Sequence, residues 1–296
     1  MLKENEALGI PDSGFLYIKL SREQEKERLN EFLEIRDFLV EVANSRTVPE
    51  FQGRNRNIQF INYGDTQLVY VLSADSRKYT LLLGQPSTEF GTVKREYDNL
   101  RKIGKGNNDV VVPTHYFKDS TNTRELYVTP YLYQARCIAC DDCGWGVYVP
   151  EPDYHFRTFS EDEKRVINSS MIAKLVSLYD DKNKLGVTAC KIGGGDFILE
   201  KGYEDEPLTE ENILKRMKLI AARELSPMSF DEYLQCIRNE FSRRTYYRTE
   251  EERDKSVLIN RKCRIPMTQE EIETGIALGM QLRERQKQER NQEKIK

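Results

Sequence analysis

Histidine is almost absent from this sequence, whose 296 residues include only two, His115 and His155. Serine and cysteine nucleophiles normally depend on a histidine base that a third group orients. Two histidines without a flanking signature therefore argue against an enzyme built on such a triad. His115 lies in an apolar, strand-like run, where a structural role is expected.

Long apolar segments are missing as well. No run approaches the roughly 18–20 residues of a membrane helix, and the first six residues lack the apolar core of a signal peptide. The formal net charge is only −3, so we expect neither a nucleic-acid partner nor a membrane partner. With 38% apolar and 32% charged residues, the sequence predicts a polar globular protein of the cytoplasm.

What the chain does contain is a series of apolar runs with strand and helix periodicity. Two runs flank Gly64, a third ends in Leu81-Leu82-Leu83, and a helical pattern covers Phe90 to Ile103. Two further strand-like segments follow, Val110 to Phe117 and Glu125 to Tyr133. The predicted order is three strands, one helix and two strands.

This order resembles the ATP-binding lobe of the protein-kinase and aminoglycoside-phosphotransferase superfamily. The resemblance implies an α+β, kinase-like two-lobe fold, with an antiparallel-sheet N-lobe that holds one helix and a mainly helical C-lobe. It also implies ATP and Mg²⁺ as ligands, with Gly64 in the phosphate loop, although a plain hairpin turn explains this glycine equally well.

The same resemblance places Glu96 where the helix glutamate of the family pairs with a strand lysine. The lysine is missing, because Leu81-Leu82-Leu83 occupies that stretch. Glu96 is then left to pair with Lys94 or Lys78, or to face water. Phosphoryl transfer depends on cations that stabilise the developing phosphate charge. Either Gln85, Lys78 or Arg77 therefore substitutes from a neighbouring position, or transfer is slow or absent.

Three aspartates are the catalytic candidates, and they depend on how the glycine run before Asp196 is matched. In one register Gly195-Asp196 is similar to the His-Gly-Asp catalytic loop, and Asp196 is the base. In the other, Asp196-Phe197-Ile198 is similar to the Asp-Phe-Gly metal loop, and Asp180 or Asp181 stands near the catalytic position. Neither register supplies the asparagine of the family in its place, although Asn183 lies close in the second.

The glycine run itself, Gly193, Gly194 and Gly195, is a candidate for nucleotide binding. Consecutive glycines before an aspartate are typical of backbone that approaches a phosphate. They are equally typical of a tight turn into a strand that ends in a surface aspartate. If Asp196 carries the chemistry, replacing it by alanine should remove that chemistry and leave the fold intact.

Cysteines form the other cluster, with Cys137, Cys140 and Cys143 at every third position. In a cytoplasmic chain such crowding favours a metal over disulfides, so structural zinc, free thiols and redox or cluster chemistry are the alternatives. Tetrahedral zinc needs four ligands. The candidates for the fourth ligand are Cys190, His155, Asp141, Asp142, Cys236 and Cys263.

The pattern divides the chain into five predicted segments. These are an N-terminal strand and helix extension (1–54), the kinase-like N-lobe (55–133), a cysteine-rich and loop-rich insertion or linker (134–158), a helical C-lobe (159–282) and a charged tail (283–296). The tail has no apolar stripe, so it is expected to add little to the core.

Four helices are predicted in the fourth segment. Ser160 begins one over Glu161–Tyr179, Thr209 caps one over Glu210–Leu225, a third covers Phe230–Phe241, and Thr268 with Glu271 forms the capping box of the last.

Because the strand lysine and the catalytic asparagine are both missing, the sequence favours a degenerate (pseudo)kinase that binds a nucleotide or a protein partner. Two alternatives stay open. One is an atypical ATP-dependent phosphotransferase that acts on a small molecule. The other is a non-catalytic scaffold with a zinc-stabilised loop.

Overall fold

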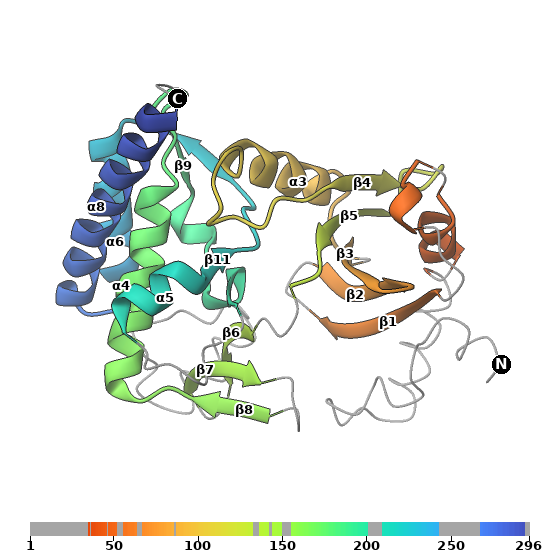
Figure 1. Cartoon of the computed structure of the whole chain (residues 1–296), viewed down its shortest axis with the longest axis horizontal. Helices are drawn as coiled ribbons and strands as arrows, with labels where there is room; N and C mark the ends of the chain where they lie inside the picture. The colour runs from red at the N-terminus through yellow and green to blue at the C-terminus, as the bar shows by residue number, and fades with distance from the viewer. Residues whose placement is uncertain are drawn as a thin grey trace. The chain divides into compact units, whose positions relative to one another are not determined.

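The fold is a mixed arrangement of helices and antiparallel sheets, seen in a computed structural model (Figure 1). The structure describes residues 35, 37–45, 47–51, 56–63, 67–85, 87–132, 136–141, 144–149, 155–200, 209–242 and 267–293. The chain forms two compact units. Unit 1 comprises Met1–Tyr97 and Pro113–Tyr131, and unit 2 comprises Asp98–Val112 and Leu132–Lys296.

Unit 1 is built on a five-stranded antiparallel sheet with the strand order β1-β2-β3-β5-β4. The strands are β1 (Arg56–Tyr63), β2 (Gln67–Ala74), β3 (Arg77–Gly84), β4 (His115–Lys118) and β5 (Glu125–Pro130), and helix α3 (Thr92–Ile103) follows β3. The predicted order of three strands, one helix and two strands is confirmed. Leu81, Leu82 and Leu83 lie in β3 and all three are buried, as their apolar character requires.

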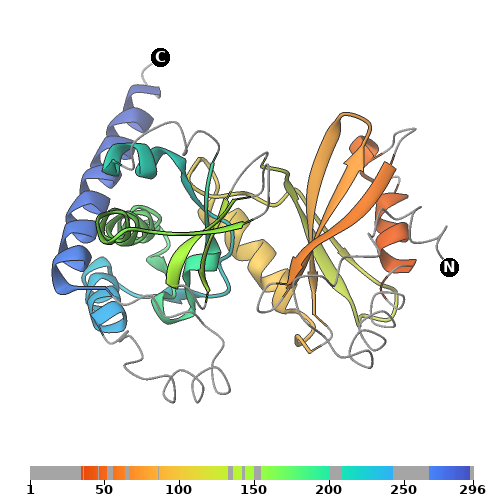
Figure 2. The same ribbon diagram turned by 90° about the horizontal axis from the view of Figure 1, so that it is seen from below.

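The core of unit 1 lies between the sheet and a helical stretch that includes residues 37–43 (Figure 2). Alternate residues of β2, among them Leu68 and Leu72, bury their side chains in this core. Phe51, in the 3-10 turn η1 (Pro49–Phe51), is fully buried there, and its ring centroid lies 6.2 Å from that of His115. His115 thus packs beside aromatic rings, which agrees with its predicted structural role.

Unit 2 contains a second sheet, with the order β11-β10-β6-β7-β8. Three of its strands, β6 (Arg136–Asp141), β7 (Gly144–Val149) and β8 (His155–Thr158), occupy the segment that the sequence predicted to be rich in loops. Of the residues that suggested loops, Cys137 and Cys140 lie in β6 and Trp145 lies in β7, whereas Pro150 and Pro152 follow β7 in the sequence.

Helices make up most of the remainder of unit 2. They are α4 (Glu161–Ser177), α5 (Glu210–Arg216), α6 (Phe230–Ser242) and α8 (Gln269–Glu293). The three predicted N-terminal residues of these helices are confirmed. Ser160 and Glu163 form a capping box on α4, Thr209 caps α5, and Thr268 and Glu271 form a capping box on α8. Among the described residues, no helix combines the length and the apolar character needed to cross a membrane.

Helices α4 and α8 pack side by side (Figure 1), and two glycines let their backbones approach. A Cβ atom added at Gly279 would lie 2.5 Å from Cβ of Val176 and 2.8 Å from the carbonyl oxygen of Ala173. A Cβ atom added at Gly275 would lie 2.6 Å from Cβ of Ile172. These distances are too short for any side chain, so glycine is what sets the spacing of the two helices.

One predicted helix is shorter than expected. The helix predicted over Glu210–Leu225 ends at Arg216, and the next residues form β11 (Met217–Leu219), which pairs with β10 (Phe197–Leu199). The last residues form β12 (Leu225–Pro227), which pairs with β9 (Leu185–Val187). Met217 and Leu219 are fully buried in this sheet, so pairing with distant strands overrides the local helical pattern.

Candidate functional site

Asp196, the principal catalytic candidate, is buried and already engaged. It closes the 3-10 turn η3 (Gly194–Asp196), and only 2% of the residue is exposed. Its carboxylate accepts a hydrogen bond of 2.7 Å from the backbone N–H of Gly193. The guanidinium of Arg223 lies 2.8 Å from the carboxylate oxygens. The interpretation of Asp196 as a surface residue is therefore wrong.

The pair between Asp196 and Arg223 joins two segments of unit 2. Arg223 also donates to the carbonyl oxygen of Lys191 at 2.9 Å, and the backbone N–H of Ile220 donates to the carbonyl oxygen of Asp196 at 2.8 Å. Removing one member of a buried ion pair leaves an uncompensated charge and is strongly destabilising. We therefore expect Asp196→Ala to destabilise unit 2, in contrast to the expectation from the sequence that the fold stays intact.

The three glycines before Asp196 form a turn that this aspartate stabilises. The N–H of Gly193 is directed at Asp196, while Gly194 and Gly195 belong to η3. The N–H of Gly193 is therefore used within the chain. Gly64, the other glycine predicted to bind phosphate, lies outside the described residues.

Glu96, in unit 1, has a partner that sequence reasoning missed. The residue is only 1% exposed, and its Oε2 accepts a hydrogen bond of 2.6 Å from Nε2 of Gln67 at the start of β2. A neutral amide thus contacts the carboxylate that the resemblance would pair with a lysine. The suggestion that Glu96 faces water is wrong.

Glu125 is a further buried carboxylate of unit 1 that the sequence did not indicate. It accepts hydrogen bonds of 2.8 Å from the backbone N–H groups of Gly91 and Val93 and from the hydroxyl of Tyr116. These amides lie at the start of α3, where a helix has unpaired N–H groups and favours negative charge. Glu125 therefore caps α3 from a neighbouring strand, a structural role.

The cysteine cluster is described only in part. Cys137 and Cys140 belong to β6, and Cys143 lies outside the described residues. Cys190 is an exposed free thiol of the turn η2 (Ala189–Lys191). The described part of the chain contains no group of three metal-ligating side chains. A zinc site over Cys137, Cys140, Cys143 and Cys190 stays a prediction.

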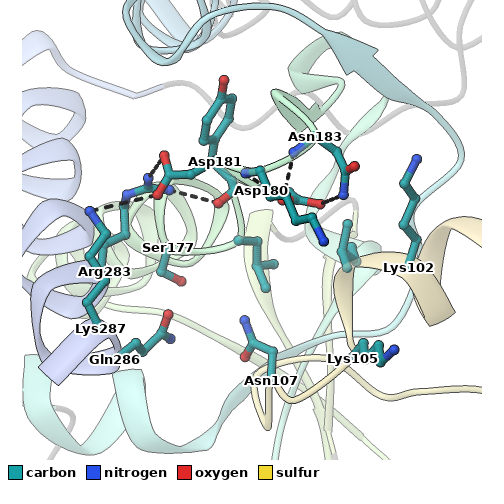
Figure 3. A pocket seen from close by; sticks show the side chains of 14 residues that line it. Lys102, Lys105, Asn107, Ser177, Asp180, Asp181, Asn183, Arg283, Gln286 and Lys287 are labelled. Atoms are coloured by element: carbon teal, nitrogen blue, oxygen red, sulfur yellow. Dashed lines mark hydrogen bonds and ion pairs between the residues drawn. The ribbon is translucent and has the colours of Figure 1, made fainter. Parts of the chain in front are cut away.

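The other two aspartates, Asp180 and Asp181, line a cavity of about 520 Å³ in unit 2 (Figure 3). Both follow the end of α4. The walls come from three parts of the unit: the last turn of α3 with the loop behind it, the turn between α4 and β9, and the last turns of α8. The cavity is thus the place where two of the predicted catalytic residues meet side chains distant in sequence.

Asp180 organises the turn that follows α4. Its Oδ1 accepts hydrogen bonds from the backbone N–H groups of Lys182 (3.0 Å) and Asn183 (3.1 Å), and its Oδ2 accepts one of 2.6 Å from Nδ2 of Asn183. Burial favours the neutral acid, but these hydrogen bonds outweigh it and lower the pKa of Asp180 below its usual value. Asp180 is therefore an ionised turn residue.

Asp181 pairs with α8. Its Oδ1 lies 2.6 Å from Nη2 of Arg283, and its Oδ2 lies 3.7 Å from Nζ of Lys287. Arg283 is only 6% exposed, and it also donates to the carbonyl oxygens of Val176 (3.2 Å) and Tyr179 (2.9 Å) at the end of α4. The predicted tail thus begins with a residue that is buried against α4, contrary to expectation.

Positive charge predominates around the cavity. Two carboxylates, Asp180 and Asp181, face five basic residues, so the lining carries a formal charge of +3 in a chain whose net charge is −3. The basic residues are Lys102, Lys105, Lys182, Arg283 and Lys287. No local motif marks them in the sequence, since they come from separate elements and each resembles an ordinary surface residue.

A buried ion pair lies beside the cavity. Lys174 of α4, 2% exposed, places its Nζ 2.5 Å from Oδ1 of Asp109. Burial lowers the pKa of Lys174, and the carboxylate of Asp109 opposes this effect. Asp109 also accepts a hydrogen bond of 3.4 Å from Nε2 of Gln286, which lines the cavity. The pair holds the 105–109 loop against α4 and α8.

Comparison with known proteins does not assign this chain to a family. No family model and no curated protein matches the sequence. Among solved structures, the chain is similar to "WaaP in complex with acyl carrier protein", with 12% identity, a TM-score of 0.37, and coverage of 79% of this chain and 89% of that chain. A structural similarity with so low a TM-score does not support a fold assignment, so the kinase-like two-lobe fold stays a prediction from the sequence.

Proposed function

We propose that this chain is a kinase-like protein that has lost phosphoryl transfer and acts by binding. The observation that carries the proposal is the ion pair of the buried Asp196 with Arg223. Phosphoryl transfer needs a carboxylate that holds Mg²⁺ or receives the proton of the substrate. An aspartate whose oxygens already contact a guanidinium and a backbone N–H is poorly placed for either role.

The other catalytic candidates support the same conclusion. Asp180 accepts three hydrogen bonds within its own turn, and Asp181 pairs with Arg283. Each of the three aspartates thus has a hydrogen-bond or ion-pair partner within unit 2.

The cation that should neutralise phosphate charge is missing as well. Leu81, Leu82 and Leu83 are buried in β3, and the carboxylate of Glu96 contacts Gln67. An active-site cation contributes several kcal/mol to the stabilisation of a phosphoryl-transfer transition state. These residues supply none of it, which favours a degenerate protein over an atypical phosphotransferase.

The test is a comparison of turnover with binding. Purified chain is incubated with millimolar ATP and Mg²⁺, and ADP release is followed in a coupled assay. We expect no release above the buffer rate. Magnesium-dependent ADP release by wild type would refute the proposal, whether the variant Asp196→Asn loses this release or retains it. The fold of the variant is verified by circular dichroism.

Binding is measured on the same samples by thermal shift. Since Asp196 is engaged by Arg223, a nucleotide should be held without its metal aspartate, and ATP should raise the melting temperature equally with and without Mg²⁺. A shift that requires Mg²⁺ would contradict this expectation. If ATP gives no shift, the nucleotide half of the proposal fails and a protein partner is the ligand class that is left.

A further inference from the structure

The proposed function makes no use of the basic cavity of Figure 3. We propose that this cavity binds a small molecule that carries two or more phosphate groups. The inference goes beyond the proposed function, because it concerns unit 2 alone and does not depend on Asp196 or on a kinase-like fold.

The first step concerns the two carboxylates, which would otherwise repel an anion. Asp180 directs both oxygens at the N–H groups of its own turn, and Asp181 directs one oxygen at Arg283 at 2.6 Å. Both carboxylates therefore have donors within the chain, and the five basic residues of the lining still outnumber them. The excess charge that a ligand would meet is positive.

The second step concerns the lysines. Lys102, Lys105 and Lys182 are exposed and line the cavity, and none of them forms an ion pair within the described part of the chain. They come from α3, from the loop after it and from the turn after α4. Like charges that line one cavity repel each other, and an anion between them relieves this repulsion.

The third step is the geometry of the cavity. Figure 3 shows Lys102 and Lys105 on one side and Arg283, Gln286 and Lys287 on the other, with Asn107 between them. Oδ1 of Asn107 accepts the backbone N–H of Asp109, so its Nδ2 is available as a neutral donor. Positive charge on two sides suits a ligand with separated anionic groups better than one with a single anion.

The fourth step is size. A volume of about 520 Å³ lies within the range of pockets that enclose a small molecule. Lysine binds phosphate as a flexible point charge, and such contacts are frequent at phosphate sites. A small polyphosphorylated compound therefore fits the volume and the charge together. An acidic peptide would need a longer groove.

The test uses inorganic phosphate, pyrophosphate and tripolyphosphate as probes in isothermal titration calorimetry. We expect tripolyphosphate to bind at one site per chain and at least tenfold more tightly than phosphate, since it contacts more than one basic group. Binding should weaken with added salt, because the lysines are exposed. No saturable binding of wild type to tripolyphosphate at millimolar concentration overturns the proposal.

The variant Lys102→Gln/Lys182→Gln removes one basic group from each of two walls. A charged hydrogen bond lost at each position should raise the Kd about tenfold, or about a hundredfold for the pair. The matched control is Arg101→Gln/Lys184→Gln, which changes exposed residues outside the lining, in α3 and in the turn after α4, and has the same charge loss. The control should change the Kd by less than about threefold.

Two further outcomes would overturn the proposal. If the control pair weakens binding as much as the cavity pair, the effect is one of general charge and not of a site. If a glutamate-rich peptide displaces tripolyphosphate at a lower concentration than pyrophosphate does, the surface is one for a protein partner. Both outcomes are distinct from failure of the proposed function, which is decided by ADP release.

Discussion

Arg283 should contribute more to the stability of unit 2 than any other residue of the predicted tail. Its guanidinium donates to the carbonyl oxygens of Val176 and Tyr179, and its central carbon lies 4.2 Å from the ring centroid of Phe230. The last carbonyl groups of a helix have no partner within that helix. Arg283 therefore satisfies the end of α4 from α8, and Arg283→Met removes this contact while keeping an apolar stem.

The expected loss can be worked from the contacts. A buried carbonyl oxygen left without a donor costs about 1–3 kcal/mol. This cost applies to Tyr179, because the carbonyl oxygen of Val176 also accepts the backbone N–H of Tyr179 at 3.3 Å. The cation–π contact contributes about 0.5–2 kcal/mol. The ion pair with Asp181 adds about 0–1 kcal/mol, because the side chain of Asp181 is 55% exposed. These contributions overlap, so we expect Arg283→Met to lower the free energy of unfolding by about 2–4 kcal/mol, which is large for a single substitution.

The assay is urea unfolding followed by tryptophan fluorescence. The single tryptophan, Trp145, belongs to β7 of unit 2, so its signal reports this unit. Two truncations provide a matched pair: a chain that ends at Leu282 lacks Arg283, whereas one that ends at Gln288 keeps it. The longer chain should lie within about 0.5 kcal/mol of wild type, as for ordinary surface changes.

The result that would refute this reasoning is equal stability of the two truncated chains. A second check is Arg283→Lys, which keeps the charge and loses the planar fork of donors. It should recover less than half of the stability that Arg283→Met loses. Full recovery would show that charge alone matters and that the two carbonyl contacts do not.

Four further predictions follow from the same structure. Asp196→Ala should destabilise unit 2 by about 2–4 kcal/mol, because it leaves the partly buried Arg223 charged and without its carboxylate; an unchanged urea midpoint would contradict this. Gly279→Ala should cost about 1–2 kcal/mol in the same assay, since overpacking against α4 exceeds the gain in helix propensity, and a stabilised variant would refute the close packing. At Asp119, burial raises the pKa, but hydrogen bonds from its loop outweigh it and hold the pKa well below its usual value. The difference in melting temperature between wild type and Asp119→Ala should therefore be largest near pH 7 and should shrink as the pH falls below about 4. A difference that grows on acidification would contradict a lowered pKa of Asp119. The zinc prediction for residues 137–143 requires about one equivalent of metal by elemental analysis, and freely titratable thiols with less than a few tenths of an equivalent would remove it.

The parts of the fold that could be predicted are those encoded by neighbouring residues. The strand and helix order of residues 58–130 follows from apolar periodicity, and the start of α8 follows from Thr268 with Glu271 three positions later. In each case the interacting groups lie within one element or one turn. Local chemistry decides such features almost alone, so a sequence is sufficient to find them.

The parts that could not be predicted depend on partners distant in sequence. Arg283 resembles its solvated neighbours in a charged run, yet it caps a helix that ends about a hundred positions earlier. Met217 and Leu219 fit a helical stripe as well as a strand, and only pairing with β10 decides between the two. The lysines of the cavity carry no local signal, since their role depends on three elements coming together.

The aspartates show why catalytic motifs and turns are easily confused. Asp180 follows a long helix and Asp196 follows three glycines, and both positions are places where the chain reverses direction. A catalytic loop and a tight turn both need glycine for backbone freedom and a carboxylate that accepts N–H groups. The local pattern is therefore the same for both. A catalytic aspartate and a turn aspartate differ in what else the carboxylate contacts. In a catalytic loop it contacts a metal or the proton of a substrate, whereas in this chain Asp196 contacts Arg223 and Asp180 contacts Asn183. Because the arginine lies 27 positions from its aspartate, this distinction becomes visible only when the fold brings the two side chains together.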